Sequence, residues 1–272
     1  MSVQLLVSAV NAQPAELAEA MNISSDAIVV NQCSKYDYTE LERKGYKIRF
    51  FSMNERGVGL SRNHALLRAD HEISLFADED IVYVDNYKEL VEKAFREHPE
   101  ADMLLFYVKA APGRETYTIE KEGRVRWYNC GRYPTYSFAV RTERVRALNI
   151  TFHLLFGGGA PYSNGEDSLF ISECLKKGMK VLKVPVTLGA ENGRESTWFK
   201  GYNEKFFYDR GVLFHFLYGR LKRLMALRFL LAHRGEMCVD IPFAHALALM
   251  KKGMKEATFI GREKEQNHEA NV

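Results

Sequence analysis

The chain has 272 residues, of which 46% are hydrophobic and 27% charged, an ordinary composition for a globular protein with one large core or two modest ones. A net charge of only +3, without a Lys/Arg cluster interleaved with aromatic residues, excludes nucleic acid as a partner. The four cysteines are widely spaced without a zinc-ligand pattern, so we interpret them as reduced thiols of a cytoplasmic protein.

The first seven residues lack a basic leader and a cleavage site, and they predict a first strand rather than a signal peptide. No apolar run is long enough to cross a bilayer, because arginine and lysine interrupt the most apolar segment near the C-terminus. We therefore expect a soluble protein.

The first part of the chain alternates short apolar runs with segments of helical periodicity. This pattern predicts strands at residues 5–9, 27–30, 47–51, 73–77 and 103–108, and helices at residues 14–21, 60–68 and 86–97. The alternation indicates an α/β fold with a mostly parallel sheet, helices on both faces and right-handed crossovers.

After residue 114 the pattern changes. Apolar stretches at residues 115–119 and 125–128 flank a Glu-Gly turn and predict a strand-rich insertion with a hairpin. A strand at 136–140, a helix at 142–148 capped by Thr142, a helix at 168–177 and a strand at 180–184 are expected next.

Beyond Trp198 the sequence predicts helices, with Phe243, Leu247, Met250 and Met254 on one apolar stripe. We expect a main domain of residues 1–200, a helical C-terminal extension of residues 201–260 and a frayed polar tail of residues 261–272.

Three consecutive carboxylates, Asp78-Glu79-Asp80, stand between two runs that are typical of buried strands. In open α/β sheets the ligand crevice lies beyond the carboxyl ends of the strands, where these acids are expected. Carboxylate oxygens suit hard cations such as Mg²⁺ or Mn²⁺, so the triplet predicts a metal site. A solvated acidic turn is the alternative for the triplet taken alone.

Three other motifs stand in chain order with this triplet. Asn31-Gln32 follows a predicted strand, and both Gly59-Leu60-Ser61-Arg62-Asn63 and Gly165-Glu166-Asp167 open predicted helices. Each motif alone has a simpler explanation, since Arg62 could be a surface charge and the two acids could stabilise a helix N-terminus. In this order, however, the four motifs resemble a family 2 glycosyltransferase of GT-A fold over residues 4–210, of the bacterial type that builds capsular or lipopolysaccharide sugars.

The resemblance implies roles for the acidic triplet and for the first helix motif. Asp80 matches the last acid of a D-x-D motif that binds the metal on a nucleotide-sugar diphosphate, and Glu79 takes the variable position. Asp78 is expected nearer the nucleoside and ribose, and with Asp80 it holds the metal-diphosphate. Arg62 and Asn63 match an Arg-Asn pair near the nucleotide, where the helix start at Leu60 would offer N–H groups to anions.

For the base and the acceptor, the resemblance implies three further contacts. Asn31 and Gln32 stand where the family usually carries an acid that contacts the base, and an amide can pair with a uracil edge. Glu166-Asp167 matches the catalytic pair in which the aspartate is the general base of an inverting displacement. Asp167 would need partial desolvation, because a helix N-terminus lowers carboxylate basicity. Trp198 is suited to stacking on an acceptor sugar or to core packing.

The resemblance therefore predicts a metal-dependent hexosyltransferase that uses Mn²⁺ or Mg²⁺. Its donor would be a nucleotide sugar, UDP-linked galactose or glucose, and its acceptor a hydroxyl of a cell-surface glycan or lipid-linked oligosaccharide. A sugar-phosphate nucleotidyltransferase would need a Gly-rich, Arg-containing loop after the first strand. A phosphatase of the haloacid dehalogenase type would need an aspartate at the same place. Residues 7–14 contain neither such a loop nor an aspartate. A non-catalytic glycan-binding protein is a further alternative.

Residues 213–234 mix bulky apolar side chains with five arginines and lysines, a composition typical of helices on anionic lipid surfaces. At about 100° per residue, Arg220, Lys222 and Arg228 point in different directions, which favours a packed helical extension instead. The hypothesis that remains is weak membrane-surface contact by a cytoplasmic enzyme at the inner face of the plasma membrane.

Overall fold

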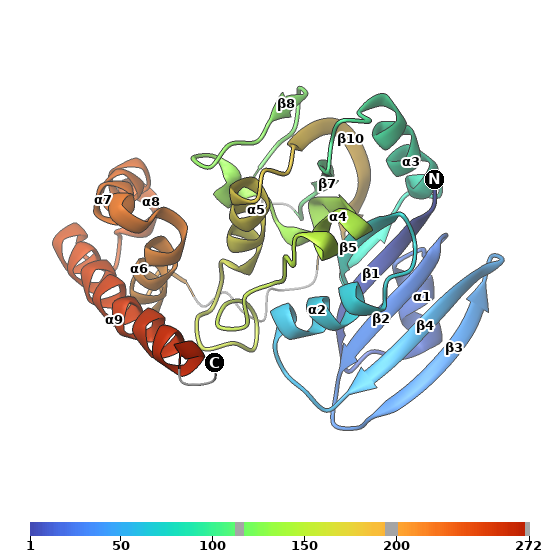
Figure 1. The fold of residues 1–272 in the computed structure, drawn as a ribbon, viewed down its shortest axis with the longest axis horizontal. Helices are drawn as coiled ribbons and strands as arrows, with labels where there is room; N and C mark the ends of the chain where they lie inside the picture. Colours follow the sequence, from blue (N-terminus) through green and yellow to red (C-terminus); the bar gives the residue numbers. More distant parts are fainter. Residues whose placement is uncertain (112–116, 194–200, 270–272) are drawn as a thin grey trace. The chain divides into compact units, whose positions relative to one another are not determined.

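A computed structural model describes residues 1–111, 117–193 and 201–269, with side chains up to Phe259 (Figure 1). The described chain divides into two compact units. The first contains Met1–Ala160 and the chain from Glu166 to the end of the last strand; the second contains Pro161–Gly165 and the C-terminal helices. The predicted α/β class, with a mostly parallel sheet and a helical C-terminal region, is confirmed. The predicted domain boundaries remain a prediction.

The first unit is built on one sheet, whose strand order in the described residues is β3-β4-β2-β1-β5-β9-β7-β10-β6, with β8 paired to β10. The strands are β1 (Val3–Val10), β2 (Asp26–Gln32), β3 (Asp37–Arg43), β4 (Tyr46–Met53), β5 (Ile73–Asp78), β6 (Ile81–Tyr83), β7 (Met103–Lys109), β8 (Gly123–Arg124), β9 (Phe138–Arg141) and β10 (Val181–Glu191). Strands β4, β2, β1 and β5 run parallel, so their carboxyl ends lie at one edge of the sheet.

Helices cover both faces of this sheet. They are α1 (Pro14–Ala20), α2 (Val58–Arg68), α3 (Tyr87–Glu97), α4 (Thr142–Ala147) and α5 (Glu166–Lys176). One core packs Leu17 of α1 and Phe95 of α3 against the sheet. The other core packs Leu66 of α2, Val145 of α4 and Phe170 of α5. Because successive strand residues point to opposite faces, β1, which is buried from Val3 to Ala9, supplies both cores.

Three local predictions were wrong or incomplete. Strand β3, which is polar and exposed, carries no apolar run; it pairs antiparallel with β4 through Lys44-Gly45, where both residues have positive φ as in a tight hairpin turn. The predicted hairpin around Gly123 does not form in residues 117–128, since β8 pairs with β10 instead. Thr142 is not a helix cap, because its buried hydroxyl is hydrogen-bonded to Ser74 at 2.9 Å.

The second unit is helical in its described residues. Its helices are α6 (Glu204–Tyr218), α7 (Lys222–Ala232), α8 (Arg234–Met237) and α9 (Phe243–Glu269). Met250 and Met254 of the predicted apolar stripe are buried, and Phe243 and Leu247 are partly buried. In the part of the chain that the structure describes, no helix is both long and apolar enough to cross a membrane.

Candidate functional site

A buried arginine joins two of the predicted motifs at the carboxyl edge of the sheet. Arg62 lies on α2, and only 4% of its surface is exposed. Its Nη2 donates to Oδ1 of Asp78 at 2.7 Å, at the end of β5, and its Nη1 donates to Oε1 of Glu166 at 2.9 Å, at the start of α5. The structure therefore brings together three residues that the sequence assigned to one site.

The two carboxylates keep this arginine charged. Burial alone would lower the pKa of Arg62, but Asp78 and Glu166 outweigh burial and raise it above its usual value. The ring of Phe152 lies 5.5 Å from the guanidinium carbon and covers part of the group. The alternative that Arg62 is a surface charge is thus wrong, because the residue is a fixed, desolvated cation between two acids.

Asp167 follows Glu166 in the first turn of α5. Burial and the neighbouring Glu166 raise the pKa of Asp167 to about 7, while hydrogen bonds from Ser168 and the charge of Arg62 oppose this shift. The Ser168 amide and hydroxyl donate to Oδ1 of Asp167 at 2.6 and 3.2 Å. Desolvation therefore outweighs the helix N-terminus, and the carboxylate is suited to accept a proton near neutral pH.

The acidic triplet is anchored to the sheet on both sides. Oε2 of Glu79 accepts a hydrogen bond from the Val10 amide at 3.1 Å, at the end of β1. The Asp80 carbonyl accepts from the Asn192 amide at 2.8 Å, just after β10. Asp78, Glu79 and Asp80 are partly buried, so this turn is held in place rather than free in solvent.

A metal would have to be held by few protein ligands here. Among the residues that the structure describes, no three His, Cys, Asp or Glu side chains form a metal-binding group. Asp78 and Asp80 stand two positions apart and offer carboxylate oxygens, although Arg62 engages one oxygen of Asp78. This donor set fits a hard cation such as Mg²⁺, which one or two carboxylates commonly hold together with substrate phosphates and water.

A further acid, Glu191, lies near the acidic triplet and was missed by the sequence analysis. Glu191 ends β10, and its carboxylate accepts hydrogen bonds from the Tyr136 hydroxyl at 2.8 Å and the Ala111 amide at 3.0 Å. Burial and Glu191 together raise the pKa of Tyr136. Because Glu191 pairs with Ile81 in β6, it lies close to the acidic triplet.

The amides of Asn31 and Gln32 hold neighbouring loops. The side chain of Asn31 accepts from the Ala12 amide at 2.9 Å and donates to the Ala12 carbonyl at 3.2 Å. Oε1 of Gln32 accepts from the Gly57 amide at 2.8 Å, just before α2. Both side chains therefore shape the strand ends, and their predicted contact with a nucleotide base remains a prediction.

Asn63 has a comparable role one turn into α2. Its side chain accepts from the Phe152 amide at 2.7 Å and donates to the Phe152 carbonyl at 2.9 Å. These bonds fix the ring of Phe152 beside Arg62, so Asn63 supports the site through protein contacts. A direct contact of Asn63 with the nucleotide remains a prediction.

A glycine loop closes over the start of α2. Gly157 has a φ of +99°, and a Cβ there would lie 2.5 Å from Cγ1 of Val58 and 2.8 Å from Cδ of Glu166. The Val58 amide donates to the Gly158 carbonyl at 2.8 Å. Helix α2 thus begins at Val58 rather than at the predicted Leu60, and its first amide is bonded to this loop. The contact of an anion with the amides at the start of this helix remains a prediction.

Trp198, the predicted acceptor contact, lies outside the described residues. The structure therefore does not place it.

Comparison with known proteins agrees with this arrangement. The family model "Glycosyl transferase family 2" matches residues 8–165. The search of curated proteins finds no match. Among solved structures, S. aureus TarS 1-349 in complex with UDP-GlcNAc is 18% identical with a TM-score of 0.60, covering 88% of this chain and 74% of that one.

A second similar structure is the mannosyltransferase PcManGT from Pyrobaculum calidifontis in complex with GDP-Man and Mn²⁺. It is 14% identical with a TM-score of 0.50, covering 94% of this chain and 74% of that one. At these identities the likeness shows the fold alone, which is the predicted GT-A fold. Because the family model matches more than half of the residues of this chain, the chain belongs to glycosyl transferase family 2.

Proposed function

We propose that the protein is an inverting, metal-dependent glycosyltransferase. It transfers a hexose from a nucleotide sugar, with UDP-galactose or UDP-glucose as the expected donor, to a hydroxyl of a cell-surface glycan or lipid-linked oligosaccharide. The observation that carries this proposal is the bridge of Arg62 between Asp78 and Glu166, beside an Asp167 whose pKa is raised to about 7.

Asp167 is the proposed general base. Its carboxylate takes the proton of the acceptor hydroxyl while the hydroxyl oxygen forms a bond to the anomeric carbon and the bond from that carbon to the diphosphate breaks. A base is most effective when its pKa lies near the working pH, and the raised pKa of Asp167 meets this condition. Glu166 supports the base by raising its pKa, and Arg62 holds Glu166 in place.

Asp78 and Asp80 are the proposed residues on the donor side. A divalent cation held by them would stabilise the negative charge that gathers on the leaving nucleoside diphosphate. Arg62 orients Asp78 through a charge-assisted hydrogen bond, so that this carboxylate is preorganised before the donor binds. The two similar structures, one in complex with UDP-GlcNAc and the other with GDP-Man and Mn²⁺, support a nucleotide-sugar donor.

The alternatives explain the site less well. Membership in glycosyl transferase family 2 disfavours a sugar-phosphate nucleotidyltransferase. A non-catalytic glycan-binding protein would have no use for a buried arginine that fixes two carboxylates beside a third whose pKa lies near neutrality.

A lipid-linked acceptor would bring the enzyme to the inner face of the plasma membrane, and α7 offers a surface for this contact. Leu224, Leu227 and Leu231 are 62%, 40% and 59% exposed. No aspartate or glutamate occurs between Gly219 and Arg234, although this stretch carries five arginines and lysines. Burial of the opposite side of α7 explains why it folds against the unit, but it does not explain the exposed leucines.

A donor screen tests the proposed activity. Release of nucleoside diphosphate is followed for UDP- and GDP-linked hexoses, with Mn²⁺, with Mg²⁺ and with a chelator. We expect UDP to be released from a UDP-hexose. The chelator should abolish this release, and Asp167→Asn should suppress it. Release that a chelator leaves unchanged would contradict the metal requirement, and release that the variant leaves unchanged would contradict the base.

A further inference from the structure

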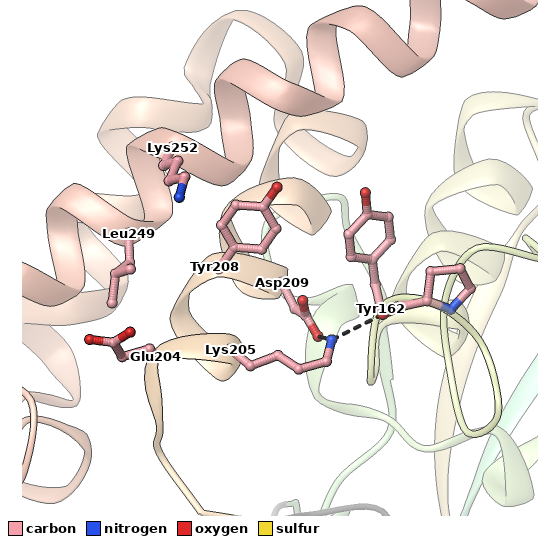
Figure 2. Close-up of a pocket in the computed structure, with 8 residues that line it drawn as sticks. Tyr162, Glu204, Lys205, Tyr208, Asp209, Leu249 and Lys252 are labelled. Atoms are coloured by element: carbon pink, nitrogen blue, oxygen red, sulfur yellow. Dashed lines mark hydrogen bonds and ion pairs between the residues drawn. The ribbon is translucent and has the colours of Figure 1, made fainter.

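The second unit contains a pocket of about 380 Å³ outside the proposed donor site (Figure 2). It lies between the Pro161–Gly165 segment and helices α6 and α9. Its walls carry Tyr162, Glu204, Lys205, Tyr208, Leu249 and Lys252.

A buried carboxylate organises one wall of this pocket. Asp209 is only 2% exposed, and it accepts hydrogen bonds from the Lys205 ammonium at 2.6 Å and from the Ser163 amide and hydroxyl at 2.9 and 2.8 Å. Lys205 also donates to the Pro161 carbonyl at 3.0 Å. Helix α6 therefore fixes the Pro161–Gly165 segment before any ligand arrives.

The other wall combines the aromatic ring of Tyr208 with the ammonium group of Lys252. Lys252 lies 6.0 Å from the ring centre of Tyr208, and among the described residues its ammonium makes no ion pair. Burial and a hydrogen bond to Glu256 raise the pKa of Tyr208, so its hydroxyl stays protonated. Glu204 is paired with His245 at 2.8 Å.

The chemistry of these walls selects a class of ligand. Two tyrosine rings offer flat apolar faces, and the walls carry two ammonium groups and two carboxylates, so their formal charges sum to zero. The hydroxyls of a sugar ring both donate and accept hydrogen bonds, and its C–H face packs on an aromatic ring. An anion would instead meet Glu204, and an apolar ligand would strip water from the charged groups without replacing its hydrogen bonds.

We propose that this pocket binds a neutral saccharide unit of the acceptor. The identification of the saccharide as acceptor rests on the proposed function, but its binding does not. Tyr162 precedes Asp167 by five positions, and an extended chain of that length spans at most about 18 Å. The pocket wall is therefore joined to the proposed base by a short chain segment. A saccharide bound in the pocket would be a part of the acceptor that is remote from the reacting hydroxyl.

The test measures saccharide binding to the full chain without donor, by saturation-transfer NMR and titration calorimetry. The probes are lactose, cellobiose and N,N′-diacetylchitobiose, with glucose 6-phosphate as an anionic comparison. We expect at least one neutral probe to bind at millimolar concentration. Tyr208→Ala and Lys252→Ala each weaken it about tenfold, which corresponds to about 1.4 kcal/mol.

Two variants separate recognition from folding. Tyr208→Phe keeps the ring and loses the hydroxyl, so binding is retained. Lys251→Ala removes an exposed lysine of α9 that does not line the pocket, so it changes nothing. Equal binding to wild type and the pocket variants, no binding of any neutral probe, or a preference for glucose 6-phosphate would each overturn the proposal.

The activity assay distinguishes failure of this inference from failure of the proposed function. Tyr208→Ala and Lys252→Ala leave donor hydrolysis to water unchanged and raise the KM for a saccharide acceptor. Pocket-dependent saccharide binding without any turnover of nucleotide sugars would support the pocket and contradict the transferase. If the enzyme turns over nucleotide sugars but both variants have the acceptor KM of wild type, the result would support the proposed transferase activity and contradict acceptor binding in the pocket.

Discussion

Arg62 and Glu166 stand 104 positions apart in the sequence, yet a charge-assisted hydrogen bond of 2.9 Å joins them inside the protein. The same guanidinium reaches Asp78 with its other terminal nitrogen. The proposed donor side and the proposed base side of the site thus share one rigid, permanently charged group. A change on either side is transmitted to the other, because both carboxylates are bonded to the same buried guanidinium.

Arg62→Lys tests this bridge. Lysine keeps the charge but cannot donate to two carboxylates from one planar group, so we expect loss of turnover and a loss of stability of about 3–5 kcal/mol, the range measured when a buried pair is broken. Urea unfolding and nucleoside diphosphate release measure the two effects. The control is Arg49→Lys, which changes a single ion pair with the half-exposed Asp70, where about 0–1 kcal/mol is expected. If both variants lose equal amounts of stability and turnover, Arg62 has no special role in the proposed site.

Asp167→Asn should separate the base from donor binding. We expect donor and metal affinity close to wild type and turnover lower by about 10²-fold or more, because a general base acts only in the transition state. We expect wild-type turnover to rise with pH through about 7, since the carboxylate must lose its proton to act. The residual turnover of the variant should not show this rise with pH. Turnover within a few-fold of wild type would leave Asp167 as a residue that stabilises the start of α5.

The same variant carries a stability signature of the raised pKa. Between its unfolded pKa of 3.8 and its folded pKa of about 7, Asp167 binds a proton more tightly in the folded state, so its contribution to stability falls as pH rises. Asparagine resembles the protonated form at every pH. We therefore expect Asp167→Asn to raise the Tm above about pH 7 and to leave it nearly unchanged near pH 4. A lower Tm above pH 7 would contradict the raised pKa.

The sequence predicted the strands that carry the site because each is a short apolar run. Strands β1, β2 and β5 lie where the pattern placed them, and Asp78 and Glu166 follow from strand and helix boundaries. The bridge by Arg62 could not be predicted, because a contact over more than a hundred positions leaves no local pattern.

Strand β10 shows a second limit. The strand predicted there ends at residue 184. Pro185 follows, and proline cannot donate to a sheet ladder. The structure carries Pro185 at a register shift between Lys183 and Thr187, so the strand continues to Glu191. Glu191 was missed for this reason. Asn31 and Gln32 were predicted to follow a strand that ends at residue 30, but they are the last two residues of β2. Their protein partners depend on loops that the sequence pattern does not position.

Gly157→Ala should disturb the site through Glu166. The new Cβ would meet Val58 and the Glu166 carboxylate at a φ of +99°, so either the loop or the carboxylate must move. The matched control is Gly178→Ala, which has a φ of +81° but no atom within 4 Å of the new Cβ. We expect the control to lose about 1–2 kcal/mol from backbone strain alone and to keep its turnover. We expect Gly157→Ala to lose more stability than the control and to lose most of its turnover. Full activity of Gly157→Ala would contradict the prediction, because it would show that the site tolerates a displaced Glu166.

Asp80→Asn should abolish metal-dependent donor binding, because removing one of two carboxylates weakens both charge neutralisation and geometry at a diphosphate-metal site. Titration calorimetry with UDP and Mn²⁺ measures the change. Asp240→Asn, in the exposed stretch before α9, is the control for loss of one surface charge. Unchanged metal-dependent affinity in Asp80→Asn would contradict the metal assignment.

Helix α7 is the surface on which membrane contact can be tested. Leu224, Leu227 and Leu231 follow helical spacing on one exposed face, and the exposed Arg223 and Arg228 border it on either side. Lys222 is less suited to mutation than the sequence suggested, because its ammonium is bonded to His215 at 2.8 Å. We expect wild type to co-sediment in part with anionic vesicles at low salt.

The double variant Arg223→Glu with Arg228→Glu should lose this sedimentation, since each basic residue near an anionic surface contributes about 1 kcal/mol. Changing the three leucines to serine should weaken binding even at low salt, because buried apolar area supplies the other part of the affinity. The matched control is Lys93→Glu with Arg96→Glu on α3, which reverses two exposed charges in the other unit. If wild type stays in the supernatant with strongly anionic vesicles, or if the α3 variant loses binding equally, the leucine face of α7 has no role at a membrane and the enzyme meets its acceptor without it.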